Sequence, residues 1–269
     1  MSLNILFGIQ GTGNGHISRS REVVRELKNL GHKIQCVFSG REPALLRETE
    51  LFEPFQALPG LTFATERGKI RLLKSVRNLN FPRLYRDIAS FDSQKFDLVI
   101  TDFEPITARV AKRNKIPSIG IGHQYAFTYK IPKAGYNPVS SWILNHFAFA
   151  DIGLGLHWHH FNQPILPPII PHMDAVSHTI ADKILVYLPF EHPDDIYALL
   201  KPFDQYRFYI YGHAAQAAER DHLHLRPFSR TEFLNDLRDC SGIVTNAGFE
   251  TVAEAIHLKK KVLVKPVIG

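Results

Sequence analysis

Short apolar runs alternate along the chain with segments of helical periodicity, which is the pattern of a parallel sheet covered by helices. The first half contains predicted strands at 4–9, 33–39, 96–102, 117–122 and 151–156. Helices are expected after His16, before Gly31, around Lys74 and between Pro105 and Asn114. The second half contains predicted strands at 183–190, 206–212, 240–246 and 260–266, and a predicted helix over 249–258. The pattern therefore predicts an α/β protein.

A proline-rich stretch separates these two groups of elements. The run NQPILPPIIPH contains prolines that can neither extend a helix nor fill the centre of a sheet. We therefore predict a first domain over 1–163, a linker over 164–181 and a second domain over 182–269. The last strand ends in PVIG with no following helix to cover it, so we expect the second domain to be incomplete.

Composition places the chain among cytoplasmic globular proteins. The 269 residues are 45% hydrophobic and 22% charged, which is enough to bury a core. No apolar run approaches the roughly 20 residues that cross a bilayer, and the first one is too short for a secretion signal. Cys36 and Cys240 lie in or beside strand-like stretches without a CxxC partner, so we predict free buried thiols.

The net charge of +6 is concentrated in a basic segment from Arg67 to Arg86. One interpretation is a solvated helix face. The other is an interfacial helix that makes peripheral contact with an anionic membrane, at the inner face of the cell membrane. Helix-turn-helix, zinc-finger and RNA-binding aromatic motifs are not evident, so no nucleic-acid partner is predicted.

A glycine-rich loop joins the first predicted strand to the first helix, in the stretch GTGNGHISRS. Gly11, Gly13 and Gly15, with Asn14 between them, let the backbone approach a ligand, and the helix start offers free N–H groups to an anion. The spacing is not G-x-G-x-x-G, and the second strand ends in VFSG without an acid, which disfavours NAD. A Walker loop would need a lysine where His16 stands. A tight turn with an incidental histidine is the alternative.

Three motifs in order, GTGNGHISRS, LVITDFEP and TNAGFETVAEAIHLKKKVLVKP, resemble inverting glycosyltransferases of the GT-B fold. The chain is similar to the peptidoglycan N-acetylglucosaminyltransferase, the UDP-glycosyltransferases and uncharacterised microbial relatives. The resemblance implies two Rossmann-like, doubly wound domains that face each other across a cleft. It also implies a hexosyltransferase that uses a nucleotide diphosphate sugar, expected to be a UDP-sugar, and a hydroxyl acceptor, with no metal and no cofactor. A cell-envelope glycan and a lipid-linked acceptor fit this resemblance.

Roles in the first domain follow from the resemblance. His16 matches the base that deprotonates the acceptor, and Asp102 matches the acid that orients this base, with Glu104 as a substitute. As an alternative, Asp102 caps the helix that begins near Pro105. His123 follows a strand of the same domain and is expected either to contact the acceptor or to be structural. The predicted acceptor and loop residues are Gly11, Gly13, Asn14, Gly15, Glu104 and His123.

Roles in the second domain concern the donor. The resemblance implies that the turn Asn246, Ala247 and Gly248 holds the diphosphate, and that Glu254 takes the ribose hydroxyls, with Glu250 as the runner-up. Acids early in a helix also complement its dipole, which is the alternative. Phe228 and Ser229 match the segment that receives the base. The sequence departs from the relatives where Phe190 and Glu191 replace glycines.

Two other function classes stay open. A nucleotide-sugar epimerase would have the same architecture, and a non-catalytic nucleotide-binding protein would need no base. The histidines of GLHWHHFN (His157, His159 and His160) have no convincing acidic or cysteine partner, so a surface loop is favoured over a metal site.

Overall fold

The computed structural model describes most of the chain. The described residues are 2–60, 65–66, 69–70, 81–92, 95–133, 141–142, 144, 146–173, 178–212 and 214–266. The helix expected around Lys74 and most of the basic segment lie outside the described residues. Among the residues that are described, no helix combines the length and the apolar character that crossing a membrane requires.

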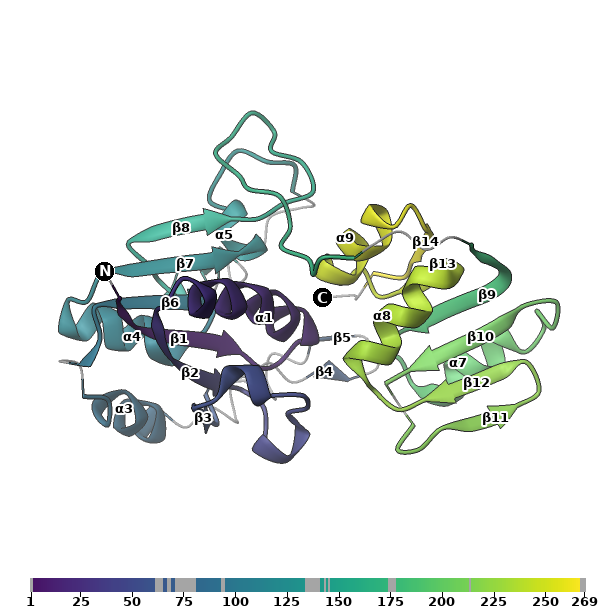
Figure 1. Cartoon of the computed structure of the whole chain (residues 1–269), viewed down its shortest axis with the longest axis horizontal. Helices are drawn as coiled ribbons and strands as arrows, with labels where there is room; N and C mark the ends of the chain where they lie inside the picture. Colours follow the sequence, from purple (N-terminus) through teal and green to yellow (C-terminus); the bar gives the residue numbers. More distant parts are fainter. Residues whose placement is uncertain are drawn as a thin grey trace. The chain divides into compact units, whose positions relative to one another are not determined.

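A six-stranded parallel sheet forms the centre of the first unit (Figure 1). Its order is β3-β2-β1-β6-β7-β8, with strands β1 (Asn4–Gln10), β2 (Lys33–Ser39), β3 (Phe55–Leu58), β6 (Leu98–Asp102), β7 (Ser118–Gly122) and β8 (Ile152–Gly155). Its helices are α1 (Asn14–Asn29), α3 (Phe81–Ala89), α4 (Pro105–Asn114) and α5 (His123–Ala126), with 3-10 turns at Pro43–Leu45 and Glu50–Phe52. A separate antiparallel pair, which compact packing assigns to the second unit, joins β4 (Thr65–Glu66) and β5 (Lys69–Ile70).

The apolar run of β1 is covered on both faces of the sheet. Ile5, Leu6, Phe7 and Ile9 are at most 1% exposed, because α1 and α4 both pack on this strand. Gly8 interrupts the run for a steric reason. A Cβ atom at Gly8 would lie 1.9 Å from Thr107 Oγ1, so the glycine makes room for the first turn of α4.

The second unit has its own six-stranded sheet, parallel except for one edge strand (Figure 1). The order is β11-β12-β10-β9-β13-β14, with strands β9 (Ile180–Tyr187), β10 (Arg207–Tyr211), β11 (Ala218–Arg220), β12 (Leu223–Arg226), β13 (Cys240–Thr245) and β14 (Lys261–Val264). The helices are α7 (Pro193–Leu200), α8 (Arg230–Asp239) and α9 (Phe249–His257). Within this sheet β11 runs antiparallel to β12, and the other pairings of the described strands are parallel.

Alternation along β9 divides the core of the second unit into two layers. Leu185 belongs to a cluster with Phe233 and Leu237 of α8, whereas Val186 belongs to a cluster with Ile196 and Leu200 of α7. Successive side chains of a strand point to opposite faces, so one strand fills both layers. The predicted α/β class with two Rossmann-like sheets is confirmed.

The predicted linker begins as part of the first unit. Compact packing assigns residues up to Pro171 to the first unit, apart from β4 and β5, and assigns β4, β5 and the residues from His172 onward to the second unit. Ile165 is buried against Ala126 and Ile131, and Leu166 forms a parallel bridge with Leu156. The beginning of the proline-rich stretch is therefore packed on the first unit.

Both thiols are buried, as the sequence predicts. Cys36 and Cys240 are free and have no exposed surface. Burial raises the pKa of Cys36 to about 12 and that of Cys240 to about 11, although Lys28 and Lys260 act in the opposite direction. Neither thiol is therefore a thiolate near neutral pH.

Candidate active site

The first unit places its polar loop residues at a topological switch point. Ile9 of β1 lies beside Asp102 of β6 in the parallel register, and β2 lies on the other side of β1. The connections that leave β1 and β6 therefore run in opposite directions, and ligands of open α/β sheets bind at such a point. The glycine-rich loop follows β1, so His16 and Asp102 meet here.

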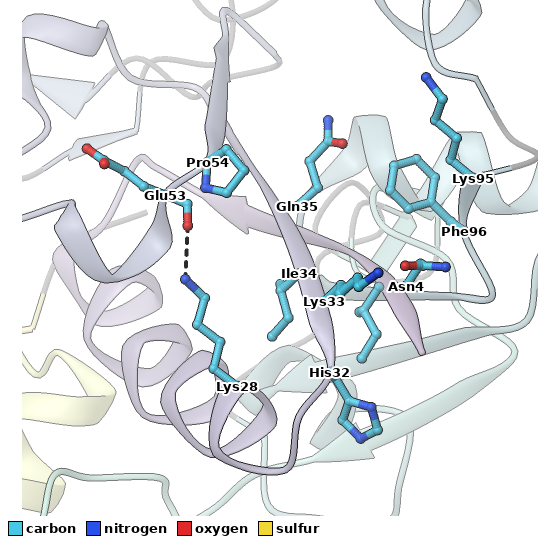
Figure 2. Close-up of a pocket in the computed structure, with 11 residues that line it drawn as sticks. Asn4, Lys28, His32, Lys33, Ile34, Gln35, Glu53, Pro54, Lys95 and Phe96 are labelled. Atoms are coloured by element: carbon cyan, nitrogen blue, oxygen red, sulfur yellow. Dashed lines mark hydrogen bonds between the residues drawn. The ribbon is translucent and has the colours of Figure 1, made fainter. Parts of the chain in front are cut away.

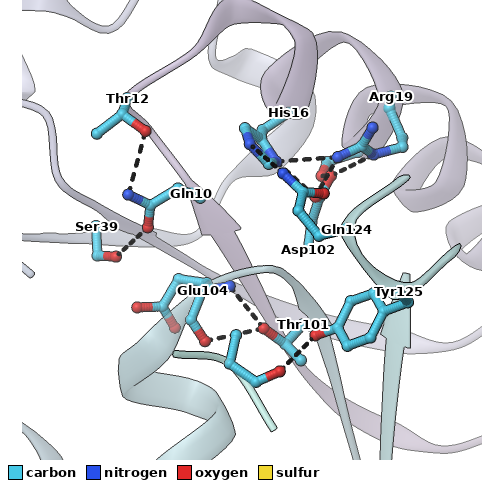
Figure 3. Close-up of polar contacts among 12 residues, drawn as sticks. Gln10, Thr12, His16, Arg19, Ser39, Thr101, Asp102, Glu104, Gln124 and Tyr125 are labelled. Atoms are coloured by element: carbon cyan, nitrogen blue, oxygen red, sulfur yellow. Dashed lines mark hydrogen bonds and ion pairs between the residues drawn. The ribbon is translucent and has the colours of Figure 1, made fainter. Parts of the chain in front are cut away.

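His16, Asp102 and Arg19 form one hydrogen-bonded group (Figure 3). His16 Nδ1 lies 2.7 Å from Asp102 Oδ1. Arg19 donates from Nε to Asp102 Oδ2 at 2.8 Å and from Nη2 to Oδ1 at 2.5 Å. Ser20 Oγ donates to Oδ2 at 2.9 Å. The predicted pairing of His16 with Asp102 is present in the structure, and the carboxylate has two further partners.

The charge of Asp102 determines how the imidazole is arranged. Burial acts to raise the pKa of this carboxyl, but the charges and hydrogen bonds of Arg19 and His16 hold it well below its usual range. An ionised carboxylate only accepts hydrogen bonds, so the proton between Oδ1 and Nδ1 belongs to His16. Nε2 then carries the lone pair. Gln124 Nε2 lies 3.4 Å from this atom, in agreement with an amide that donates to it.

Glu104 caps α4 instead of contacting His16. Its side chain accepts from the backbone of Ile106 at 2.8 Å, and from the backbone and hydroxyl of Thr107, both at 2.6 Å. Burial raises the pKa of Glu104, although these hydrogen bonds favour its charged form. The alternative in which Asp102 caps this helix is therefore wrong, because Glu104 is the cap and Asp102 bonds to α1. The structure also leaves Glu104 no role as a substitute partner for His16.

At Gly11 of the glycine loop, neighbouring atoms leave little room for a side chain. Gly11 N donates to the Ser39 carbonyl at 2.7 Å, and a Cβ atom at Gly11 would lie 2.9 Å from that of Arg41. Gly13 is the N-cap of α1 with an ordinary φ of −129° and no side-chain cap. The predicted loop residues Asn14 and Gly15 are the first residues of α1, and Asn14 Oδ1 accepts from Arg41 Nη1 at 2.7 Å.

His123 lies at the same edge of the sheet, at the start of α5. Burial, and then the charges of Arg19 and His16, lower the pKa of His123 to about 3. The ring is therefore neutral at any pH at which the protein would be assayed. Its ring packs edge-on against Phe127 at 6.3 Å.

Three residues of this group were not among the predicted ones: Arg19, Ser20 and Gln124. A sequence signal for two of them was available, because Arg19 and Ser20 follow His16 by three and four positions and so share its helix face. Gln124 has no such signal, since only the pairing of β6 with β7 brings its segment beside the strand that ends in Asp102.

In the second unit, the turn Asn246–Gly248 also lies at a topological switch point. Thr245 of β13 lies beside Tyr187 of β9. Ala247 has a φ of 64°, and Gly248 is an N-cap without a side-chain hydrogen bond, so the turn leads directly into α9. Asn246 Nδ2 donates to Glu191 Oε1 at 3.0 Å and to the Lys265 carbonyl at 3.1 Å. Asn246 thus ties together the loops that follow β9 and β14.

Glu254 is buried in an ion pair. It is 1% exposed, and both of its carboxylate oxygens contact the guanidinium of Arg230. Glu250, the predicted runner-up, is also buried. The Phe228 ring lies 6.3 Å from that of Tyr187, at the end of β9. Ser229 caps α8 by accepting from Glu232 N at 3.3 Å.

A family model described as glycosyl transferase family 1 matches residues 3–137 and 159–269. The chain belongs to this family. It is a glycosyltransferase, as the sequence predicts. A search among curated proteins finds no match.

Solved glycosyltransferase structures share the fold. The glycosyltransferase of kitacinnamycin is 14% identical with a TM-score of 0.66, over 100% of this chain and 81% of that one. SsfS6 from Streptomyces sp. SF2575, complexed with thymidine diphosphate, is 16% identical with a TM-score of 0.63, over 99% and 82%. UGT89C1 from Arabidopsis thaliana, complexed with UDP, is 14% identical with a TM-score of 0.55, over 99% and 80%.

The glycosyltransferase also has a hollow of about 790 Å³ at the amino-terminal ends of β1 and β2 (Figure 2). Lys33 and His32 line it, together with Lys28. Lys28 Nζ is already bound to the carbonyls of Leu51 at 2.7 Å and Glu53 at 2.9 Å. Because ligands of parallel α/β sheets bind at the carboxyl ends of strands, this hollow is not part of the candidate site.

Metal ligands are not grouped in the part of the chain that the structure describes. No set of three or more His, Cys, Asp or Glu side chains is placed there to hold an ion. His159 and His160 are exposed, and their rings stack at 4.8 Å.

Proposed function

We propose that this glycosyltransferase moves a sugar from a nucleoside diphosphate sugar to a hydroxyl acceptor, with inversion at the anomeric carbon and without a metal ion. The observation that carries the proposal is the 2.7 Å contact between His16 Nδ1 and Asp102 Oδ1. It leaves Nε2 as a proton acceptor at the carboxyl edge of the first sheet. A side chain in that state is what a hydroxyl nucleophile requires.

The proposed step uses His16 as the general base. Nε2 takes the proton of the acceptor hydroxyl while its oxygen forms a bond to the anomeric carbon. The bond from that carbon to the β-phosphate oxygen breaks, and the nucleoside diphosphate departs on the opposite face. Asp102 stays ionised and stabilises the imidazolium that forms, because it accepts the Nδ1 proton throughout.

The proposed donor site lies on the second unit. The backbone N–H groups at the start of α9 have no side-chain cap and suit a diphosphate. UDP and thymidine diphosphate are the first ligands to test, because UGT89C1 and SsfS6 are complexed with them. Glu254 could meet a ribose only by sharing its carboxylate with Arg230 or by releasing it.

The nature of the acceptor is a separate part of the proposal. A cell-envelope acceptor linked to lipid would bring the enzyme to an anionic membrane through the basic segment 67–86. Helix α3 contains the described carboxy-terminal part of this segment. Its Leu84 is buried, and α3 packs against α4, which argues against an apolar membrane-binding face on this helix. Sedimentation with anionic vesicles at low and high salt tests the contact.

The function is tested by incubating the enzyme with UDP-glucose and a panel of hydroxyl acceptors that includes quercetin, to which UGT89C1 is complexed. We expect a glycoside with inverted anomeric configuration by NMR, and an unchanged rate with EDTA. His16→Gln should lower kcat by about 100-fold or more while leaving UDP affinity unchanged. The matched control His257→Gln changes an exposed histidine and should retain the rate.

Three outcomes would contradict the proposal. A retained configuration excludes inversion. Isomerised sugar nucleotide without acceptor indicates the epimerase alternative. Near-normal turnover of His16→Gln shows that the base is elsewhere.

A further inference from the structure

We infer that Arg19 is a positioning residue of this reaction. It orients the Asp102 carboxylate toward His16, and its charge keeps the imidazole free to accept a proton. The inference rests on the proposed function, because it concerns the same base. It assigns a role to a residue of α1 that is buried beside the base.

Orientation follows from the way the carboxylate is held. Oδ1 accepts from His16 and from Arg19 Nη2, and Oδ2 accepts from Arg19 Nε and Ser20 Oγ. The planar guanidinium bridges both oxygens, so it fixes the rotation of the carboxyl group as well as its position. With this group fixed, one lone pair points at Nδ1, and the imidazole ring has one orientation.

The second argument concerns charge. Arg19 and Asp102 are 1% and 0% exposed, so solvent screens them weakly. A buried aspartate alone would hold a proton on the neighbouring imidazole and remove its capacity as a base. Arg19 Nη2 lies 2.9 Å from His16 Nδ1, and its positive charge opposes that protonation. The pair Arg19 and Asp102 carries no net charge, so Asp102 orients His16 without adding a net negative charge beside the ring.

The other groups around the ring do not replace this charge. His123 on α5 is neutral, since its pKa is lowered to about 3, and its further neighbour His157 also has a pKa lowered by burial. Gln124 contributes an uncharged amide. Arg19 and Asp102 are a cation and an anion that contact His16 directly.

The sheet makes room for the guanidinium at Gly122. This residue has a φ of 149°, which favours glycine, and a Cβ atom there would lie 3.2 Å from Arg19 Nη2. The guanidinium is therefore enclosed by α1, β6 and the end of β7. This enclosure is an observation independent of the hydrogen bonds to Asp102.

Two substitutions separate the two effects. Arg19→Lys keeps the charge and loses the two-point contact, whereas Arg19→Gln removes the charge. For Arg19→Gln, we expect the acid limb of the kcat profile to move to higher pH by about 1 to 3 units, with activity recovering above it. For Arg19→Lys, we expect an unmoved limb and a kcat lowered about 10-fold to 100-fold at every pH. The KM for UDP-glucose should change in neither variant.

Arg25→Gln is the matched control, because Arg25 lies on the same helix in an exposed ion pair with Glu22. It should match the wild type in both readouts. A second readout does not depend on turnover. In protein with ¹⁵N-labelled histidine, the His16 ring should show the Nδ1-protonated tautomer. In Arg19→Gln, the His16 ring or the Asp102 carboxyl should bind a proton at a higher pH than in the wild type.

Equal loss of activity in both variants at all pH values, with an unmoved acid limb and an unchanged ¹⁵N titration, would reduce Arg19 to a structural role. If Arg19→Gln does not fold, Arg19→Lys provides the test. A kcat equal to that of the wild type overturns the positioning role, and a lowered kcat with an unmoved acid limb supports it. An enzyme that transfers no sugar contradicts the proposed function, whereas the NMR comparison still tests Arg19.

Discussion

Arg230 and Glu254 form a two-point ion pair inside the second unit, in which Arg230 Nη1 donates to Glu254 Oε2 at 3.2 Å and Nη2 contacts Oε1. Glu254 is 1% exposed, and the Arg230 side chain is 14% exposed. The carboxylate that the family resemblance assigns to the donor ribose therefore already has a partner. A nucleotide would have to share this carboxylate with Arg230.

Glu254→Gln should lower the free energy of unfolding of the protein by about 3 to 5 kcal/mol, because it removes the buried carboxylate charge that the Arg230 guanidinium contacts. The double variant Glu254→Leu with Arg230→Met should recover much of this loss, since neither member of the pair then carries a charge. Chemical denaturation of the three proteins measures the difference. A single variant as stable as the wild type would show that the pair contributes nothing.

The same pair gives a prediction for donor binding. If Glu254 receives the ribose hydroxyls, Glu254→Gln should weaken UDP binding by about tenfold or more, which is the loss of a charge-assisted hydrogen bond. Arg230→Met keeps this carboxylate and should weaken UDP binding less. Isothermal titration with UDP compares the two variants. Equal effects would place the ribose site elsewhere.

Asp102→Asn should nearly abolish transfer, with a kcat lower by about 10² to 10⁴. An amide can present its NH₂ group to Nδ1, which moves the ring proton to Nε2 and removes the base. The substitution also leaves Arg19 buried without its carboxylate, so stability should fall by about 3 to 5 kcal/mol. Asp92→Asn, which breaks an exposed pair with Lys95, serves as the control and should change neither quantity appreciably. A transfer rate within tenfold of wild type would contradict the role of Asp102.

Gly8→Ala and Gly13→Ala should differ sharply in stability. The new methyl group at Gly8 would lie 1.9 Å from Thr107 Oγ1 and 2.8 Å from Glu104 Oε2, so it displaces the cap of α4 and costs about 3 kcal/mol or more. At Gly13 it would meet only His16 Cδ2, at 3.6 Å, with an ordinary φ. We expect a change within about 1 kcal/mol there. Denaturant midpoints of the two variants provide the test, and similar values would refute the steric argument.

His123 should contribute to acid lability. Its pKa is about 3 in the folded protein and about 6.5 in an unfolded chain, so between these values the unfolded state binds the additional proton. Stability from this group is therefore complete above pH 6.5 and is lost as the pH falls toward 3. His123→Gln should flatten the decline between pH 6.5 and 4 by at most about 1.4 kcal/mol per pH unit. Parallel stability curves for wild type and variant would show that the ring titrates normally.

The two thiols should be inert in the native protein. With pKa values of about 12 and 11, Cys36 and Cys240 carry almost no thiolate at pH 8, and both are fully buried. A thiol reagent should label them only as fast as the protein unfolds, and completely in denaturant. Rapid labelling of one thiol in native buffer would indicate local opening of its strand.

Several elements were predictable because their signal is local. The continuous apolar run before Gly11 identifies β1, and the helix over 249–258 appears in the structure as α9. Elements without a local apolar pattern were not predicted. The edge strand β11 is exposed at all three residues and has no apolar pattern to reveal it. The order in which the strands pair is set by contacts between distant residues, which a local pattern does not encode.

The sequence by itself determined the α/β class and the glycine loop between β1 and α1, because these depend on periodicity and short motifs. The pairing of His16 with Asp102 entered as a hypothesis that the family resemblance implies. Only the tertiary structure decided how each carboxylate is used. Asp102 is held by Arg19, Glu104 caps α4, and Glu254 binds Arg230. The physical reason is that a buried carboxylate must find donors among whatever groups packing brings to it, and these groups come from segments far apart in the chain.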